Sequence, residues 1–284
     1  MCEDCGMNQM LSDLRPRLLA RLDHFAAPPG LTGEHQIADR LFCYCALRRE
    51  RIASIVPGAA ILGIVLRGRK EIWCGTFSEV LTPGTAFALP KGMPVDVVNI
   101  PDDRGLYESL VLQIDQLPPD VAPCAAPSRI ERVSVALTPA IVEAIAHTAA
   151  ALGTARSATI AKLRLGELLT LLSDDPAGRL LLAGDAAERA RWLIDAEPDR
   201  DWQVGDLARA LGKGASSLRR ELDQLGRPFR SLVAESRMQA ARRVLEAGGD
   251  TAAAMAAAGY RSRSHFTRAF RQAHGRTPGA SRAT

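Results

Sequence analysis

Residues 251–276 read TAAAMAAAGYRSRSHFTRAFRQAHGR, and this segment predicts the architecture of the C-terminal part of the chain. Its first nine residues span about two helical turns and end in Gly259, the residue type that most readily ends a helix in a left-handed conformation. Seven residues later comes Phe266, and Phe270 follows at the spacing of a helix with one buried face. The pattern predicts two helices joined by a tight turn.

The same arrangement occurs upstream in weaker form. VGDLARALG at 204–212 also ends in Gly, and a second apolar stripe follows it. Both second helices carry Arg two positions after their first apolar anchor, at Arg220 and Arg268. Helix, short turn and second helix is the helix-turn-helix arrangement, whose second helix enters the major groove of DNA. We therefore expect two helix-turn-helix units, at about residues 203–225 and 251–273.

Between these units lies PFRSLVAESRMQAARRVLEAGG, whose apolar stripe predicts one helix from about Pro228 to Ala247. At 1.5 Å per residue this helix is about 27–30 Å long. Successive major grooves on one face of DNA are about 34 Å apart. We expect the helix to hold both recognition helices against adjacent segments of one duplex.

The exposed positions of the two second helices carry side chains that suit DNA. Arg binds guanine edges through two hydrogen bonds, while Ser, Thr and His contact base edges or phosphates. The predicted DNA-contacting residues are Ser216, Ser217, Arg219, Arg220, Arg261, Arg263, Ser264, His265, Thr267 and Arg268.

The charge of the chain is divided unevenly along its length. The net charge is +4, but residues 1–200 hold 21 Lys and Arg against 25 Asp and Glu, whereas residues 201–284 hold 15 against 7. After Asp250 there are six arginines and no acidic residue. A basic end beside a mildly acidic front indicates that only the C-terminal part meets a polyanion. The first recognition helix also contains Glu221 and Asp223, so we expect the second unit to dominate affinity.

The front of the chain has a different pattern. An amphipathic helix is expected around Met10–Phe25, and short apolar runs separated by Gly and Pro turns between residues 41 and 114 predict β-strands. Helical periodicity returns after Thr138, which is placed as a helix cap before Pro139. The chain is thus divided into a β-rich domain at 1–127, connecting helices at 128–185 and a helical domain at 186–284.

Over about residues 190–284 the sequence resembles the AraC/XylS transcription regulators. LARALG and SLRREL are similar to the first helix-turn-helix of that family, SRMQAARRVL to its linker helix, and AGYRSRSHFTRAFRQAHGRTPGASR to its signature ending. The resemblance implies a sequence-specific regulator that binds double-stranded promoter DNA and works with RNA polymerase, in the cytoplasm. The DNA contacts carried over by position are Ser216, Arg219, Arg220, Ser264, His265, Thr267 and Arg268.

The strand-rich segment is loosely similar to the cupin-like sensor domain of the same family, which implies a β-barrel that binds a small-molecule effector. A catalytic metal cupin needs clustered His ligands, and none of the five histidines lies between residues 41 and 114. We therefore predict no catalytic residues, no metal and no cofactor. The expected interior residues, candidates for effector binding or plain core packing, are Cys43, Cys45, Ile64, Leu66, Trp73 and Phe87.

Two alternatives stay open at this point. Cys2 and Cys5, together with Cys43 and Cys45, suggest a thiol- or metal-responsive regulator, since four thiolates close a soft-metal site and thiol pairs oxidise. The segment ATIAKLRLGELLTLL at 158–172 has an apolar face that suits either a homodimer or packing onto its own domain. The sequence contains no run of the roughly 18 apolar residues that a membrane helix needs.

Overall fold

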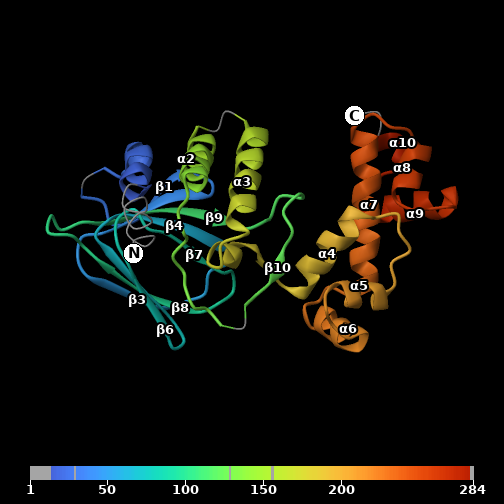
Figure 1. Ribbon diagram of the computed structural model, residues 1–284. Coiled ribbons are helices and arrows are strands. Elements are labelled where there is room, and N and C mark those ends of the chain that lie inside the picture. The colour runs from blue at the N-terminus through green and yellow to red at the C-terminus, as the bar shows by residue number, and fades with distance from the viewer. Residues whose placement is uncertain (1–13, 29, 128, 155–156, 282–284) are drawn as a thin grey trace, which may run out of the picture. The chain divides into compact units, whose positions relative to one another are not determined.

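The computed structural model describes residues 14–28, 30–127, 129–154 and 157–281. The chain divides into two compact units, Met1–Ala183 and Gly184–Thr284, and each has hydrophobic cores of its own (Figure 1). The first is built mainly from antiparallel strands with helices added, and the second from helices alone. The predicted mixed fold, β-rich in front and helical at the end, is confirmed.

The strands of the first unit form two main antiparallel sheets. The five-stranded sheet has the order β1-β2-β9-β4-β7 and the four-stranded sheet the order β3-β8-β5-β6. Buried side chains of both sheets belong to one continuous core. The strands of the first sheet are β1 (Gly33–Ala38), β2 (Leu41–Ala46), β4 (Ala60–Arg67), β7 (Ala86–Leu89) and β9 (Tyr107–Ile114); those of the second are β3 (Glu50–Ile55), β5 (Arg69–Cys74), β6 (Phe77–Leu81) and β8 (Val95–Ile100).

Helices cover the first sheet on the face away from the second (Figure 1). Residues 14–22 are helical and continue into the 3-10 turn η1 (Asp23–Phe25), within the helix predicted for this region. Helix α2 (Pro139–Gly153) begins after Thr138, whose hydroxyl accepts from the Ile141 N–H, so the predicted cap is confirmed. Helix α3 (Ala158–Leu172), η2 (Gly178–Leu182) and the two-residue strands β10 (Cys124–Ala125) and β11 (Ala183–Gly184) complete the elements of this part.

The sequence did not predict strands β1 and β6. Their side chains are mostly half-buried or exposed in alternation, and neither strand contains an apolar run. Strands β2, β4, β5, β7, β8 and β9 coincide with predicted apolar runs, β3 overlaps one only at residues 53–55, and β10 and β11 lie outside them.

The second unit consists of seven helices in the described part of the chain: α4 (Ala186–Ala196), α5 (Val204–Ala210), α6 (Ala215–Gln224), α7 (Phe229–Glu246), α8 (Thr251–Ala257), α9 (Arg263–His274) and α10 (Pro278–Ser281). The pairs α5–α6 and α8–α9 are the two predicted helix-turn-helix units, and α7 is the predicted linker helix. Among the residues that the structure describes, no helix is both long and apolar enough to cross a bilayer.

Candidate nucleic-acid interface

Each helix-turn-helix unit of the second domain is organised around two buried side chains of its second helix. Leu218 and Leu222 on α6, and Phe266 and Phe270 on α9, are all fully buried. The two sets lie in separate cores, one shared by α4 to α6 with the start of α7, the other by the rest of α7 with α8 and α9. Each second helix therefore has one face fixed in a core and the other directed to solvent.

The turns between paired helices depend on glycine. Gly212 and Gly259 both adopt φ of +67°, a left-handed conformation that other residues rarely adopt. At Gly259 space is also restricted, because an added Cβ would lie 2.6 Å from the Asp199 carbonyl oxygen. The sequence prediction of a Gly-terminated first helix is thus confirmed for both units, and at the second unit the glycine also permits close packing of a neighbouring loop.

That loop, residues 197–202, joins α4 to α5 and packs against Gly259 of the second helix-turn-helix. Arg237 on α7 donates from Nε to the Pro198 carbonyl at 3.2 Å and from Nη2 to the Arg200 carbonyl at 3.1 Å. Its guanidinium carbon is also 6.0 Å from the ring centroid of Tyr260, beside Gly259. Arg237 therefore links the loop before the first helix-turn-helix to the turn of the second helix-turn-helix.

The predicted DNA-contacting residues lie where contact is feasible. All ten are exposed except Thr267, which is half-buried. Within the part of the chain that the structure describes, no ion pair engages Arg219, Arg220, Arg261, Arg263 or Arg268. By contrast Lys213, just before α6, pairs with Glu221. These five arginines keep their charge and hydrogen-bond donors available.

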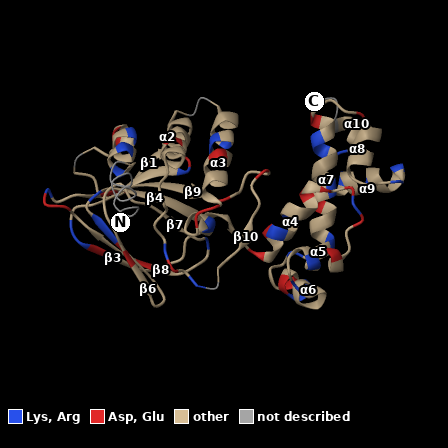
Figure 2. Ribbon diagram, viewed as in Figure 1, with Lys and Arg blue, Asp and Glu red and all other residues tan. Residues whose placement is uncertain are grey.

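The two recognition helices differ in charge. Helix α9 contains Arg263, Arg268 and Arg271 and no acidic residue, whereas α6 carries both signs, as Figure 2 shows. Beside α9 is a hollow of about 630 Å³, which is lined by Arg263, Ser264, Thr267, Arg268, Arg271 and Thr277. The sequence reasoning missed Arg271 and Thr277. Arg271 could have been found, because it lies three residues after Arg268 on the same helical face.

In the first unit, the structure corrects the expected interior. Pairing across the first sheet places Cys43, Leu110 and Ile64 in one row, and Cys43 Sγ donates to the Phe25 carbonyl at 3.0 Å on the helix-covered face. Cys45 shares that face by strand alternation. Cys43, Cys45 and Ile64 are therefore buried on the helix-covered face and not between the sheets.

The other three interior candidates lie in three different places. Phe87 does face the second sheet, with its ring centroid 5.8 Å from Lys70 Nζ. Leu66 lies at a β-bulge and lines a pocket at the end of the sheets. Trp73 is 48% exposed, because alternation along β5 turns Lys70 and Ile72 inward and leaves the indole on the outer face. The prediction that Trp73 is an interior residue is wrong.

The space between the sheets holds a row of polar side chains that the sequence did not reveal. Glu50, Asn99 and Lys70 are direct neighbours across β3, β8 and β5. Lys70 Nζ donates to Asn99 Oδ1 at 2.7 Å, Asn99 Nδ2 to Glu50 Oε2 at 3.3 Å, and the Tyr44 hydroxyl to the same Glu50 oxygen at 2.7 Å. Burial lowers the pKa of Lys70 to about 7, against a smaller opposite effect of Glu50.

Cys43 and Cys45 are poorly suited to thiolate chemistry. Burial, chiefly, raises the pKa of Cys43 to about 12 and that of Cys45 to about 11. In the described residues no group of three or more His, Cys, Asp or Glu is arranged to hold a metal. Cys2 and Cys5 lie outside the described residues.

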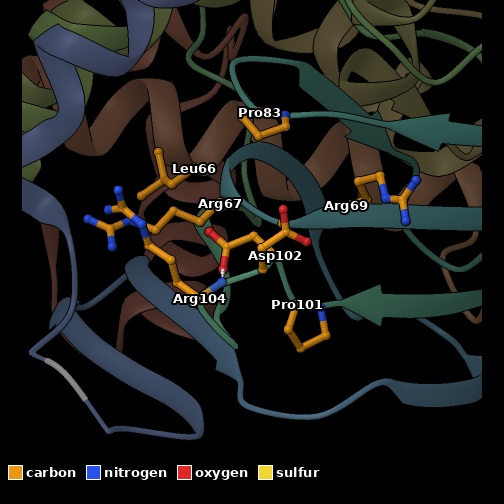
Figure 3. A pocket seen from close by; sticks show the side chains of 9 residues that line it. Leu66, Arg67, Arg69, Pro83, Pro101, Asp102 and Arg104 are labelled. Atoms are coloured by element: carbon orange, nitrogen blue, oxygen red, sulfur yellow. Dashed lines mark hydrogen bonds between the residues drawn. The ribbon is translucent and has the colours of Figure 1, made fainter.

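A pocket of about 670 Å³ opens where three turns of the first unit meet (Figure 3). One turn joins β4 to β5 at Gly68, the second precedes β7 at Pro83, and the third joins β8 to β9. Nine residues line the pocket: Leu66, Arg67, Gly68, Arg69, Pro83, Pro101, Asp102, Asp103 and Arg104. This is a polar site at the end of the sheets, distinct from the apolar interior that the sequence predicted.

Comparison with known proteins agrees with the geometry of the second unit. Residues 207–284 match a family model described as a helix-turn-helix domain. A DNA-binding transcriptional dual regulator from Escherichia coli K-12 is 25% identical, with 35% of this chain and 97% of that one covered and a TM-score of 0.34. A transcriptional regulator with an AraC-type DNA-binding domain, from Chromobacterium violaceum, is 26% identical, with 34% and 89% covered and a TM-score of 0.33.

Several solved structures of ToxT from Vibrio cholerae match over most of the chain. One of them, from strain SCE256, was solved with an unsaturated fatty acid bound. It is 14% identical, with 84% of this chain and 93% of that one covered and a TM-score of 0.40.

Proposed function

We propose, from the premise that the C-terminal domain of this chain is an AraC/XylS-type helix-turn-helix domain, that the protein is a sequence-specific transcription regulator which presents α6 and α9 to adjacent segments of one DNA duplex. The observation that carries the proposal is that both second helices are fixed by a buried apolar pair and carry, on the opposite face, arginines without ion-pair partners in the part of the chain that the structure describes. A rigid helix with free guanidinium groups is the usual reader of base edges in the major groove.

The division of work between the two helices follows from their charge. We propose that α9 supplies most of the affinity, because its arginines contact phosphates and bases without local acidic residues. Helix α6 contributes Arg219 and Arg220, while Glu221 beside them is engaged by Lys213 and Asp223 remains exposed. Helix α7, 18 residues and about 27 Å long, fixes the separation of the two.

The proposal is tested with the full chain and a random duplex pool. Repeated selection for binding, followed by footprinting of the selected duplexes, is expected to give two protected segments separated by about one helical turn, roughly 10 base pairs. A pool that gains no sequence preference after selection, with binding that only falls as salt rises, would mean a sequence-blind DNA-coating protein and would refute the proposal.

Arg268 is the side chain whose role is tested most directly. We expect Arg268→Ala to lose about 1–3 kcal/mol of binding free energy to the selected DNA and to relax the preference at one or two bases, as removal of a guanine contact does. Titrations of single-base variants of the site measure both effects. Arg242→Ala is the matched control, because this arginine lies on α7 and is paired with Glu246 at 2.7 Å. Equal weakening on every DNA would assign Arg268 to phosphate contact only.

The first unit is proposed to bind a small-molecule effector and so control the second, with RNA polymerase as the downstream partner. Support comes from the polar row between its sheets and from the pocket at their end. A thiol- or metal-responsive regulator remains the alternative only through Cys2 and Cys5, since the pKa values of Cys43 and Cys45 are raised by burial.

A homodimer through α3 is proposed from the apolar residues on its surface. Ile160 and Leu163 lie one helical turn apart and are 54% and 67% exposed, while Leu168, Leu169 and Leu172 are buried in their own unit. Exposed apolar neighbours on one helix face indicate a partner surface. We expect Leu163→Glu to convert a dimer into a monomer, as measured by sedimentation velocity, while Lys162→Glu leaves the mass unchanged. A wild-type chain that is monomeric at high concentration would contradict the dimer.

A further inference from the structure

The pocket at the end of the sheets carries more positive than negative charge that is free to act. Three arginines and two aspartates line it. Asp102 is used by its own turn, because its Oδ1 accepts from the backbone N–H groups of Arg104 at 3.0 Å and Leu106 at 3.2 Å. These bonds fix the position of Asp102 in its own turn but leave its charge in place. With three arginines against Asp102 and Asp103, the lining carries a net charge of +1.

In Figure 3 the side chains of Arg67 and Arg104 extend toward the same side of the pocket, while Arg69 points away from them. Arg67 approaches the buried Glu108 only with its Nε, at 3.9 Å from Oε2, so its terminal nitrogens have no ion pair within the described residues. Arg104 has no ion pair in the same part of the chain. Two guanidinium groups that line one pocket repel each other, and an oxyanion bound between them offsets that repulsion.

A second observation comes from the strand beneath the turn. Lys70 lies two residues beyond Gly68 on β5, only 7% exposed, and its hydrogen-bond partner is the neutral amide of Asn99. Lysine is almost never buried without a compensating partner. When protonated, this amine adds positive potential at the same end of the sheets, where the Tyr107 hydroxyl is also buried without a hydrogen-bond partner among the described residues.

We propose that this pocket binds a small oxyanion, whose carboxylate or phosphate group is held between Arg67 and Arg104, and that the effector of the protein belongs to this chemical class. The planar guanidinium groups suit either group because both present two oxygens to a pair of parallel N–H donors. The second part of the proposal rests on the proposed function, whereas the binding site itself does not.

The test is a titration of the full-length protein with sodium phosphate and, separately, sodium succinate, at an ionic strength held constant with sodium chloride. Thermal unfolding and calorimetry are expected to give saturable binding of at least one anion. The double variant R67Q/R104Q should bind it at least tenfold more weakly, while R48Q, which removes an exposed arginine outside the pocket, should bind it like the wild type.

The two arms separate the sources of the anion. Saturation by phosphate alone identifies a phosphate ligand, and saturation by succinate alone a carboxylate. The site is overturned if neither anion saturates, or if R67Q/R104Q binds as tightly as the wild type.

A DNA-binding measurement distinguishes failure of this proposal from failure of the proposed regulator function. The affinity for the selected duplex is measured with and without the saturating anion. Sequence-specific DNA binding without saturable anion binding refutes only the anion site, and saturable anion binding without any DNA sequence preference refutes only the regulator function. Saturation that leaves DNA affinity unchanged overturns the effector role while the binding site stands.

Discussion

Phe266→Ala is expected to lower the free energy of unfolding of the second helix-turn-helix unit by about 3–5 kcal/mol, the usual cost of truncating a buried phenylalanine. The side chain is fully buried, and its ring lies 5.7 Å from Tyr260 and 5.8 Å from Phe270, centroid to centroid. The core around it contains only seven buried residues, so little remains to hold α9 against α7.

The consequence for DNA is selective. Because the core of the first helix-turn-helix is separate, we expect α5 and α6 to stay folded while protection of the second half of the footprint disappears. Urea unfolding followed by circular dichroism, with hydrogen exchange to locate the change, measures the stability effect. Gln272→Ala, an exposed position on the same helix, serves as control. A loss below about 1 kcal/mol would show that the second core tolerates cavities and that Phe266 does not hold α9.

Lys70→Met is expected to change how the stability of the first unit depends on pH. In the folded protein the pKa of Lys70 is about 7, against about 10.4 for an unfolded lysine. Between these values the unfolded chain binds more protons, so wild-type stability from this group rises as pH rises from 7 toward 10. The gain between pH 7 and 9 is about 2 kcal/mol, and below pH 7 the contribution is nearly constant.

The measurement is the difference in unfolding free energy between Lys70→Met and the wild type at pH 7 and pH 9. The buried cysteines titrate alike in both proteins, so their effect cancels. We expect the stability advantage of methionine to shrink by about 2 kcal/mol over this interval, since the free-energy cost of burying the lysine falls as pH rises. Lys162→Met, at an exposed position, should show no such trend. A difference that stays constant with pH would place the ammonium in contact with solvent or with a carboxylate.

The helical domain was predictable because its signals are local. A glycine at the end of a short helix, an apolar pair four residues apart and arginines on the opposite face are all read within a dozen residues, as at Gly259, Phe266 and Phe270. The roles of the DNA-facing residues remain proposals. Arg237 could not be assigned from the sequence, since its partners Pro198 and Arg200 lie nearly forty positions away.

The first unit shows where local reasoning stops. Alternation along a strand identifies which residues share a face, but the first sheet is buried on both faces, so apolar composition could not tell which face meets the second sheet. Cys43 and Ile64 are buried core residues, as predicted, but on the helix-covered face of the sheet. Lys70 gave no signal either, because its burial follows from the pairing of three strands distant in sequence.

The separate cores of the two helix-turn-helix units have a consequence for evolution. Substitutions on the solvent face of α6 are not transmitted through a shared core to α9, so each recognition helix can acquire new bases independently. The contact of Gly259 with the Asp199 carbonyl restricts one thing only, which is the relative placement of the units. A lineage of such proteins can thus diversify its operators base by base while the spacing between half-sites is inherited.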